Sequence, residues 1–353
     1  MSPLRAAARA TLLPLLLAAS AALSSAAQAA SPPAADPDAP LALALSGARN
    51  AHDPTIAEYG GKYYRFCSGL GIPVAVSSDL REWKQAGVVF ERIPAWTRAE
   101  IPGSTDFWAP EIVKLGGRYR IYYSVSSFGS NRSAIGVASN ATLDPTESVY
   151  AWTDEGPVME SRPSDDFNAI DPCVAFDAAG DPWLVLGSFW SGIKIARLDH
   201  GSGKLSEPGA APLSIARRPE APDAIEGAYV LPWKGRYYLF VSFDFCCRGV
   251  QSSYNIRYGR SDSITGPYLD REGKPMLEGG GSLLRESGSR YKGPGHCSVL
   301  VSGGTCYLVY HAYDAQTGGI ARLRIEPLQW DEGSWPYVTG LGAGGPGARA
   351  GTP

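Results

Sequence analysis

The chain has 353 residues, of which 44% are hydrophobic and 19% charged. That length accommodates one large all-β domain or two smaller ones, and the Gly and aromatic content argues against a coiled coil or a largely disordered protein. The 32 basic and 35 acidic residues give a net charge of −3. Nothing in this balance favours nucleic acid or an anionic membrane as a partner, so a neutral partner fits better.

The N-terminal residues have the pattern of a secretory signal. Arg5 and Arg9 precede an apolar run over residues 11–23, and residues 27–29 (AQA) form a small-x-small cleavage site. A membrane span is the alternative, but the apolar run is short for one. We therefore predict a signal peptide over residues 1–29 and a secreted or periplasmic protein.

Composition also divides the rest of the chain. Residues 30–40 are rich in Pro and Ala, which predicts a linker, and residues 340–353 are rich in Gly, Ala and Pro. Such a tail buries too little apolar surface to become ordered. The globular domain is therefore predicted over residues 41–339.

One sequence pattern, a glycine followed by a short apolar and aromatic run, occurs five times. The repeats begin at Gly61, Gly117, Gly180, Gly235 and Gly304. These glycines are 56, 63, 55 and 69 residues apart. An internal period of about sixty residues indicates a repeat architecture.

Each repeat has the signals of an antiparallel meander. In the third, apolar runs over residues 173–176 and 183–189 flank a Gly-containing turn, which predicts a β-hairpin. Third strands are predicted over residues 74–77, 134–138, 193–198, 255–260 and 320–325. Residues 86–90 and 267–269 are candidates for fourth, outer strands.

A unit this small cannot bury both faces of its sheet, so neighbouring units must stack. Radial stacking of four-stranded units gives a β-propeller. The predicted fold is therefore an all-β, five-bladed β-propeller over residues 41–339. A β-helix or an irregular sandwich is the alternative. A sixty-residue unit is too long for a β-helix coil, and a sandwich predicts no fivefold repeat.

A conspicuous polar residue marks the start of the first strand in each repeat. These residues are Asp53, Glu111, Asp171, Glu226 and His296. Because the innermost strand of every blade lies against the central channel, we expect Asp53, Asp171 and Glu226 to meet at one mouth of that channel. The alternative is that these acids cap turns, as Asp-Pro dipeptides often do.

Acids brought together in a partly dry pocket cannot all ionise at their free pKa values. A protonated carboxyl group beside an ionised one is the arrangement that hydrolysis of a glycosidic bond requires. A sugar also needs polar groups for its hydroxyls and aromatic rings for its CH faces. Candidates for these contacts are Trp108, Phe128, Asn168, Trp190 and Tyr229. Core packing is the alternative for each aromatic residue.

Six motifs occur in one order along the chain. They are HDP (52–54), FWAPE (107–111), NAIDP (168–172), GSFWSG (187–192), IEG (225–227) and HAYD (311–314). Together they resemble glycoside hydrolase family 43 over about residues 48–337. GSFWSG and the run CCRG at residues 246–249 narrow the resemblance toward the α-L-arabinanases.

The resemblance implies a propeller that hydrolyses α-1,5-linked arabinofuranosyl chains (arabinan) with inversion. By motif, Asp53 resembles the general base and Glu226 the general acid, while Asp171 resembles a third acid that raises the pKa of Glu226 and orients it. Positions that match sugar contacts of the family are Gly129, Asn168, Ala169, Ile170, Ser188, Phe189 and Trp190.

The resemblance also implies that His311 reaches into the channel and, with waters, holds a metal ion, usually calcium. One imidazole is a poor ligand set for a cation that prefers oxygen, so waters would have to complete the site. A hydrogen-bonded channel histidine without metal is the alternative, and His296 competes with His311 for the role. No organic cofactor is expected.

Six cysteines in an exported chain permit disulfides, and their spacing does not match a zinc site. Adjacent cysteines rarely bond to each other, so we expect Cys246 and Cys247 to pack beneath the site, with one possible bond elsewhere. Cys297 and Cys306 are unsuited as partners, because Val301 would face Cys306 across the last hairpin. The connectivity stays open.

The sequence predicts a monomeric, endo-acting arabinanase, with three alternatives. An exo-acting enzyme would need a loop that walls off the cleft, and residues 92–104 and 202–223 are the candidates. An α-L-arabinofuranosidase or β-xylosidase of the same family is the second, although many of those carry an additional C-terminal β-sandwich. A non-catalytic sugar-binding propeller is the third, but it would repeat one motif in every blade.

Overall fold

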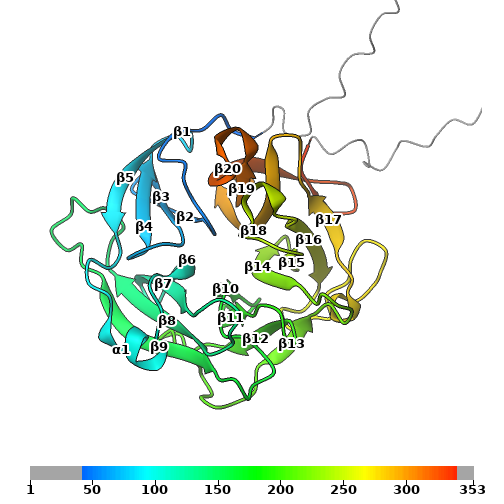
Figure 1. Cartoon of the computed structure of the whole chain (residues 1–353), viewed down its shortest axis with the longest axis horizontal. Coiled ribbons are helices and arrows are strands. Elements are labelled where there is room, and N and C mark those ends of the chain that lie inside the picture. Colours follow the sequence, from blue (N-terminus) through cyan, green and yellow to red (C-terminus); the bar gives the residue numbers. More distant parts are fainter. Residues whose placement is uncertain (1–41, 340–353) are drawn as a thin grey trace, which may run out of the picture. The chain divides into compact units, whose positions relative to one another are not determined.

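The computed structural model describes residues 42–339, which form five separate β-sheets arranged as a ring of blades (Figure 1). This confirms the predicted all-β, five-bladed propeller. The predicted signal peptide, linker and tail lie outside the described residues. Among residues 42–339, no helix is long and apolar enough to cross a membrane.

The strands follow one another blade by blade along the chain. The first blade contains β1 (Ser46–Gly47), β2 (Thr55–Tyr59), β3 (Lys62–Phe66), β4 (Pro73–Ser77) and β5 (Glu82–Val88). The second contains β6 (Trp108–Leu115), β7 (Arg118–Val125), β8 (Ser133–Asn140) and β9 (Thr153–Ser161). The third contains β10 (Cys173–Phe176), β11 (Pro182–Leu186), β12 (Ile193–Arg197) and β13 (Leu213–Ala216).

The last two blades have the same plan. The fourth contains β14 (Ile225–Trp233), β15 (Arg236–Phe243), β16 (Asn255–Ser261) and β17 (Ser282–Arg285). The fifth contains β18 (Tyr291–Ser302), β19 (Thr305–Asp314), β20 (Ile320–Trp330) and β21 (Pro336–Tyr337). The short helices are α1 (Ala95–Glu100), η1 (Gly249–Gln251), η2 (Met276–Glu278) and η3 (Ala315–Thr317).

The repeated glycines form the turn between the first two strands of each blade. In the first blade Tyr59 pairs with Lys62, so Gly60 and Gly61 are the two turn residues, with φ of 58° and 72°. Two-residue hairpins of this hand need left-handed conformations at both positions, which glycine adopts without steric cost. This requirement explains why the repeat was visible in the sequence.

Two predicted strand boundaries were wrong. The fourth strand of the fourth blade is β17, whereas the predicted segment 267–269 contributes only isolated bridges from Leu269 to Arg260 and Pro275. Pro267 has no N–H to donate to a sheet, which disfavours a ladder there. The second strand of the third blade ends at Leu186, and Phe189 lies beyond it. Phe189 and Trp190 have φ of 51° and 45°, so the chain has turned out of the sheet at this point.

The hydrophobic core is divided into five clusters, and each cluster joins two neighbouring blades. One cluster combines Phe66 and Val74 of the first blade with Ile121 of the second. Another joins the fifth blade to the first through Val309 and Trp83. The remaining three clusters join the second to the third blade, the third to the fourth, and the fourth to the fifth. Burial between blades therefore supplies the main attraction that holds the ring together.

The segment before β2 closes the ring between the first and last blades. Leu43 donates its N–H to the carbonyl of Ile325 over 2.9 Å, and Leu323 donates to Arg49 over 2.8 Å. On its other side, β1 pairs in parallel with β5. The start of the domain thus hydrogen-bonds to β20 of the fifth blade and to β5 of the first.

Candidate active site

Each blade has a residue in the left-handed conformation just before or within its inner strand. These residues are Asp53, Ala109, Asp171, Gly227 and His296, with φ between 45° and 59°. In three cases the backbone N–H donates to a serine of the preceding blade. The pairs are Ala109 with Ser68 at 2.7 Å, Asp171 with Ser124 at 2.9 Å and His296 with Ser242 at 2.7 Å.

The other two positions replace that serine by a titratable side chain. Asp53 donates its N–H to His311 Nδ1 over 3.1 Å, and Gly227 donates to Asp171 Oδ2 over 3.0 Å. One contact between blades is thus used five times. At the two variant positions it brings a histidine to Asp53 and a carboxylate to the residue that follows Glu226.

The equivalence also corrects two predicted positions. Gly227, rather than Glu226, is the equivalent residue of the fourth blade. Ala109, not Glu111, occupies the strand-start position of the second blade. Glu111 lies two residues further along β6, where it is buried and accepts a hydrogen bond from Thr55 over 2.8 Å. Burial raises the pKa of Glu111 to about 8, against the opposing effect of the Thr55 hydroxyl.

A pocket of about 800 Å³ lies over the strand starts and is lined by residues of all five blades. The three predicted acids Asp53, Asp171 and Glu226 line it, as does His296. Residues separated by more than a hundred positions therefore meet at one site, as the propeller geometry predicts.

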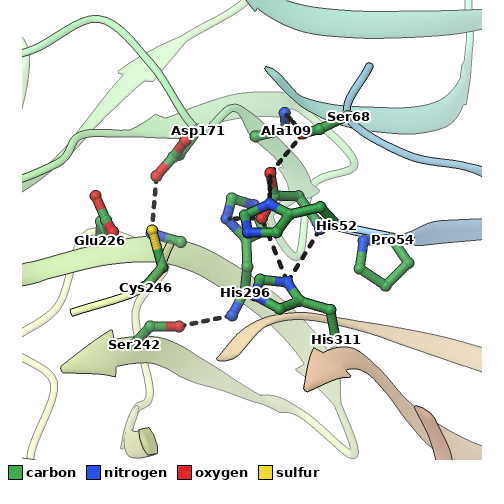
Figure 2. Close-up of polar contacts among 12 residues, drawn as sticks. His52, Pro54, Ser68, Ala109, Asp171, Glu226, Ser242, Cys246, His296 and His311 are labelled. Carbon is green, nitrogen blue, oxygen red and sulfur yellow. Dashed lines mark hydrogen bonds and ion pairs between the residues drawn. The ribbon is translucent and has the colours of Figure 1, made fainter. Parts of the chain in front are cut away.

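The imidazoles of His52, His296 and His311 lie close together (Figure 2), and the Asp53 carboxylate contacts all three. That carboxylate lies 2.8 Å from His52 Nδ1, 3.3 Å from His296 Nδ1 and 3.5 Å from His311 Nδ1. Burial alone would raise its pKa, but interactions with the three histidines outweigh burial and hold the pKa of Asp53 well below its usual range. The Ser68 hydroxyl also donates to Oδ2. Asp53 is therefore an ionised carboxylate with a fixed orientation.

Glu226 lies among hydroxyl groups instead. Ser188 donates to Oε2 over 2.5 Å, and Tyr254 donates to Oε1. Burial raises the pKa of Glu226 despite these two hydrogen bonds, and the charge of Asp53 raises it further. Burial also raises the pKa of Asp171 well above its usual value, together with the charges of Glu226 and Asp53. The pair Asp171–Glu226 thus retains a proton at pH values where a free carboxyl group has lost it.

Aromatic side chains flank the acids within the pocket. Trp108 and Phe128 of the second blade have ring centroids 5.4 Å apart, and Phe128 is 80% exposed. The ring centroid of Phe189 in the third blade lies 6.0 Å from that of Phe245 in the fourth. The side chain of Trp190 is 39% exposed. Such exposed rings offer apolar faces to a sugar chain.

Most of the predicted sugar contacts line the pocket. They are Trp108, Phe128, Gly129, Asn168, Ile170, Ser188, Phe189 and Trp190. Ala169 does not; it is fully buried in the cluster between the second and third blades. Tyr229 does not either, because it lies two residues beyond Gly227 along β14 and its hydroxyl donates to the Val299 carbonyl over 3.1 Å. Its ring packs against two core clusters.

Several lining residues escaped prediction. They include His52, Ser68, Tyr254, Phe245 and Arg248. A signal for Ser68 was present: Ser68, Ser124, Ser242 and His311 each lie seven residues after a repeat glycine, and Ser188 lies eight after its own. Tyr254 gave no such signal, since only the folded chain brings it to Glu226.

The prediction for the adjacent cysteines was wrong. Cys246 and Cys247 are bonded to each other and line the pocket, while Cys67, Cys173, Cys297 and Cys306 are free and buried. The general rarity of bonds between neighbours was the reason for expecting otherwise. The pairing of Val301 with Cys306 across the last hairpin is confirmed.

His311 is fully buried, and its Nε2 has no hydrogen-bond partner. Nδ1 is occupied by the N–H of Asp53. Its ligand atom lies within 4.8 Å of those of His52 and Asp53. A set of two imidazoles and one carboxylate is poor in the oxygen ligands that calcium prefers, so any ion here would be held largely by water. The orphaned Nε2 is compatible with such a hydrated ion.

The fold and site define a five-bladed propeller with paired carboxyl groups in a pocket that aromatic residues also line, the arrangement of a glycosidase. Residues 47–336 match the sequence profile of glycosyl hydrolases family 43. The chain belongs to this family.

Individual members of the family are similar over most of their length. The extracellular endo-α-(1→5)-L-arabinanase 1 of Bacillus subtilis is 46% identical over 305 residues, covering 84% of this chain and 91% of that protein. The extracellular exo-α-(1→5)-L-arabinofuranosidase ArbA of Cellvibrio japonicus is 40% identical over 299 residues, covering 82% and 86%. The solved endo-arabinanase of Bacillus licheniformis superposes with a TM-score of 0.78 at 46% identity, covering 84% and 99%.

Proposed function

We propose that this glycosidase is an endo-acting α-1,5-L-arabinanase that hydrolyses arabinan with inversion. The observation that carries the proposal is the contrast between two carboxyl groups in one pocket. Asp53 is held ionised by histidines, whereas Glu226 lies where burial favours its protonated form. Two similar proteins bear endo-arabinanase names, which supports arabinan as the substrate.

In the proposed mechanism Asp53 is the general base and Glu226 the general acid. Asp53 removes a proton from the attacking water while Glu226 delivers its proton to the departing glycosidic oxygen. Asp171 accepts the N–H of Gly227, so it fixes the backbone beside Glu226 and orients the acid. Its burial next to Glu226 also helps to keep a proton on the pair.

Endo action is supported by the composition of the pocket wall. Of the two segments that could block one end, residues 92–104 contribute nothing to the lining among the described residues, and residues 202–223 contribute only Asp223. Aromatic residues from the second, third and fourth blades line the pocket, so more than one sugar unit can find an apolar ring face there. The exo-acting alternative is favoured by one observation, the 40% identity to an exo-acting relative.

The test compares wild type with Asp53→Asn on linear arabinan, following reducing ends and product sizes. We expect a ladder of oligosaccharides from wild type and a loss of at least a hundredfold in the variant, since general base catalysis contributes about 10²–10⁴. Release of a single short product would establish the exo-acting alternative. Absence of hydrolysis by wild type would contradict the enzymatic proposal and favour the non-catalytic, sugar-binding propeller.

We also propose that the protein is exported and monomeric. Export is supported by the signal-like N-terminal sequence and by two relatives that are named extracellular. A monomer is supported by a pocket lined by residues of all five blades of a single chain. Fractionation of producing cells tests export. Size-exclusion chromatography with light scattering tests the monomer, and a dimer mass would contradict it.

A hydrated calcium ion near His311 is a separate proposal. The supporting observation is the buried Nε2 without a partner. When bound, the ion would supply positive charge near the acids. Elemental analysis of the purified protein should find about one calcium per chain, and His311→Gln should lose it together with the stabilisation against heating that calcium provides. Calcium-free protein with the same unfolding temperature in calcium and in chelator would contradict the proposal.

A further inference from the structure

The disulfide-bonded pair Cys246–Cys247 is connected to Asp53 through two side chains. The N–H of Cys247 donates to the Tyr313 hydroxyl oxygen over 2.8 Å, and that oxygen lies 2.8 Å from His52 Nε2. The other ring nitrogen, Nδ1 of His52, lies 2.8 Å from Asp53 Oδ2. A continuous hydrogen-bonded path thus leads from the disulfide to the general base.

This path fixes the ring of His52 at both of its nitrogens. At 2.8 Å from an ionised carboxylate oxygen, which can only accept, Nδ1 of His52 carries a hydrogen and donates to Asp53 whether or not Nε2 is also protonated. The Tyr313 hydroxyl can serve Nε2 in either case, because it can donate or accept. Stacking on His311, with centroids 3.9 Å apart, restrains the ring further. Tyr313 therefore determines where His52 meets Asp53.

The position of the Tyr313 hydroxyl depends in turn on the loop that contains the disulfide. Cys247 has a φ of 66°, a left-handed conformation that a residue with a side chain adopts only when its surroundings enforce it. The ring closed by the Cys246–Cys247 bond contains the peptide between the two residues, so it removes conformations that the open chain would have. Without the bond, the N–H of Cys247 is no longer held against Tyr313.

We propose that the Cys246–Cys247 disulfide and Tyr313 position Asp53 through His52, so that breaking the disulfide lowers the turnover number while substrate binding changes little. This inference rests on the proposed hydrolase function, with Asp53 as the general base. Tyr313 and His52 are positioning residues, since they act on the reaction through Asp53.

A second role of the disulfide makes the opposite kinetic prediction. Cys247 is exposed and both cysteines line the pocket. The only role of the disulfide could therefore be to contact the bound sugar. Loss of such a contact would raise KM and leave kcat unchanged, because substrate and transition state would lose the same interaction. The KM and kcat effects therefore separate the two roles.

The chain offers a clean way to break this bond. All six cysteines lie within residues 42–339, and the other four are free. Cys246–Cys247 is therefore the single disulfide in these residues that a reductant can break. One molecule of dithiothreitol reduces it through a mixed disulfide: the Cys246–Cys247 bond breaks, two thiols form, and the reagent becomes its cyclic disulfide. Counting thiols on the folded protein should show two additional reactive groups, because the other four are buried.

The experiment measures kcat and KM on linear arabinan for wild type and three variants, each before and after reduction. For wild type we expect reduction to lower kcat about tenfold, with KM within twofold, since small displacements of a catalytic group have effects of this size or larger. The double variant Cys246→Ser, Cys247→Ser should have the lower kcat from the start, and dithiothreitol should not change its kcat. Tyr313→Phe should also have a lower kcat, and reduction should lower it much less than in wild type, because only the 3.7 Å contact from Cys247 Sγ to His52 Nε2 then links the disulfide to His52.

Tyr63→Phe is the matched control, because the Tyr63 hydroxyl also has one side-chain partner, Ser302 at 3.0 Å, and lies outside the pocket. It should retain wild-type kinetics and the response to reduction. Thermal unfolding of every variant identifies any that fails to fold. In that case the comparison of wild type before and after reduction tests the inference by itself. An unchanged kcat after confirmed reduction, or an effect on KM only, overturns the inference. Failure of oxidised wild type to hydrolyse arabinan would instead refute the proposed function.

Discussion

At the scale of single residues, the site is defined by what surrounds each carboxyl group. Asp53 has three ring nitrogens within 3.5 Å, and Glu226 has two hydroxyl donors and a carboxyl neighbour. Asp53 is buried and Glu226 is half-buried, and desolvation alone would raise both pKa values. The imidazoles reverse this for Asp53, whereas nothing of comparable strength does so for Glu226. Two acids with opposite tasks result.

The first prediction tests Glu226 as the proton donor. Glu226→Gln should reduce hydrolysis of natural arabinan by about 10²–10⁴, but it should spare an aryl arabinofuranoside with an activated leaving group, which needs less protonation. Initial rates on the two substrates provide the measurement. Equal losses on both would show that Glu226 has another role.

The second prediction concerns Glu111, which lies outside the proposed chemistry. Its folded pKa is about 8, above the value of 4.5 for a free glutamate, so the folded state binds the additional proton. The stability it contributes is fully present below pH 4.5 and is lost as pH rises toward 8, at a slope of about 1.4 kcal/mol per pH unit. Glu111→Gln keeps an acceptor for Thr55 and should remove this loss.

The measurement is the free energy of unfolding by urea between pH 4 and pH 9. Glu111→Gln should match wild type at the acid end and exceed it at the alkaline end. Glu82→Gln is the control, since that side chain is 60% exposed. Parallel curves for wild type and Glu111→Gln would mean that Glu111 does not retain its proton in the folded state.

At the scale of elements, the start of each inner strand is the functional unit. A left-handed residue directs its backbone N–H to the preceding blade, and a serine usually receives it. The same contact therefore stabilises the blade interface and holds the residues that line the pocket. Asp171 depends on it directly, because its N–H donates to Ser124 Oγ over 2.9 Å.

The third prediction removes this contact. Ser124→Ala leaves the buried N–H of Asp171 without its partner, which should cost about 1–3 kcal/mol of stability. Because Asp171 also holds Gly227 beside Glu226, kcat should fall as well. Urea unfolding and arabinan hydrolysis measure the two effects. Ser302→Ala, at the half-buried end of β18, is the control for serine removal, because the Ser302 hydroxyl bonds to the side chains of Tyr63 and Glu58 and not to a buried N–H. An equal effect of both substitutions would contradict the special role of Ser124.

At the scale of the whole molecule, stability comes from five interfaces between blades and from the closure of the ring. Each hydrophobic cluster joins two neighbouring blades, so a blade on its own would expose two apolar faces. The cluster between the fifth and first blades also includes Leu43 and Leu45, from the segment that closes the ring.

The fourth prediction tests this closure. A chain that begins at residue 49 lacks β1, the bond from Leu43 to Ile325 and the packing of Leu45. It should unfold several degrees below a chain that begins at residue 42, because both the hydrogen bonds and the apolar contacts of the closing segment are lost. Differential scanning calorimetry provides the comparison. Identical unfolding temperatures would show that the ring closes without this segment.

Much of the architecture could be predicted because it depends on local chemistry that repeats. Gly61 and its four equivalents are needed for hairpin turns, and apolar residues follow each of them. Asp53, Asp171 and Glu226 could be placed at one mouth because strand starts converge in a propeller. Glu111 was assigned to the wrong position because a shift of two residues keeps the same face of a strand and leaves the sequence pattern unchanged.

The sequence by itself determined the number of blades, the approximate strands and the acids, since these follow from periodicity and from one geometric rule. Only the tertiary structure decided which groups surround those acids. His296 and His311 reach Asp53 from the fifth blade, Tyr254 reaches Glu226, and Tyr229 packs between blades. These contacts depend on side-chain directions at strand ends and in loops, and sequence spacing does not specify such directions.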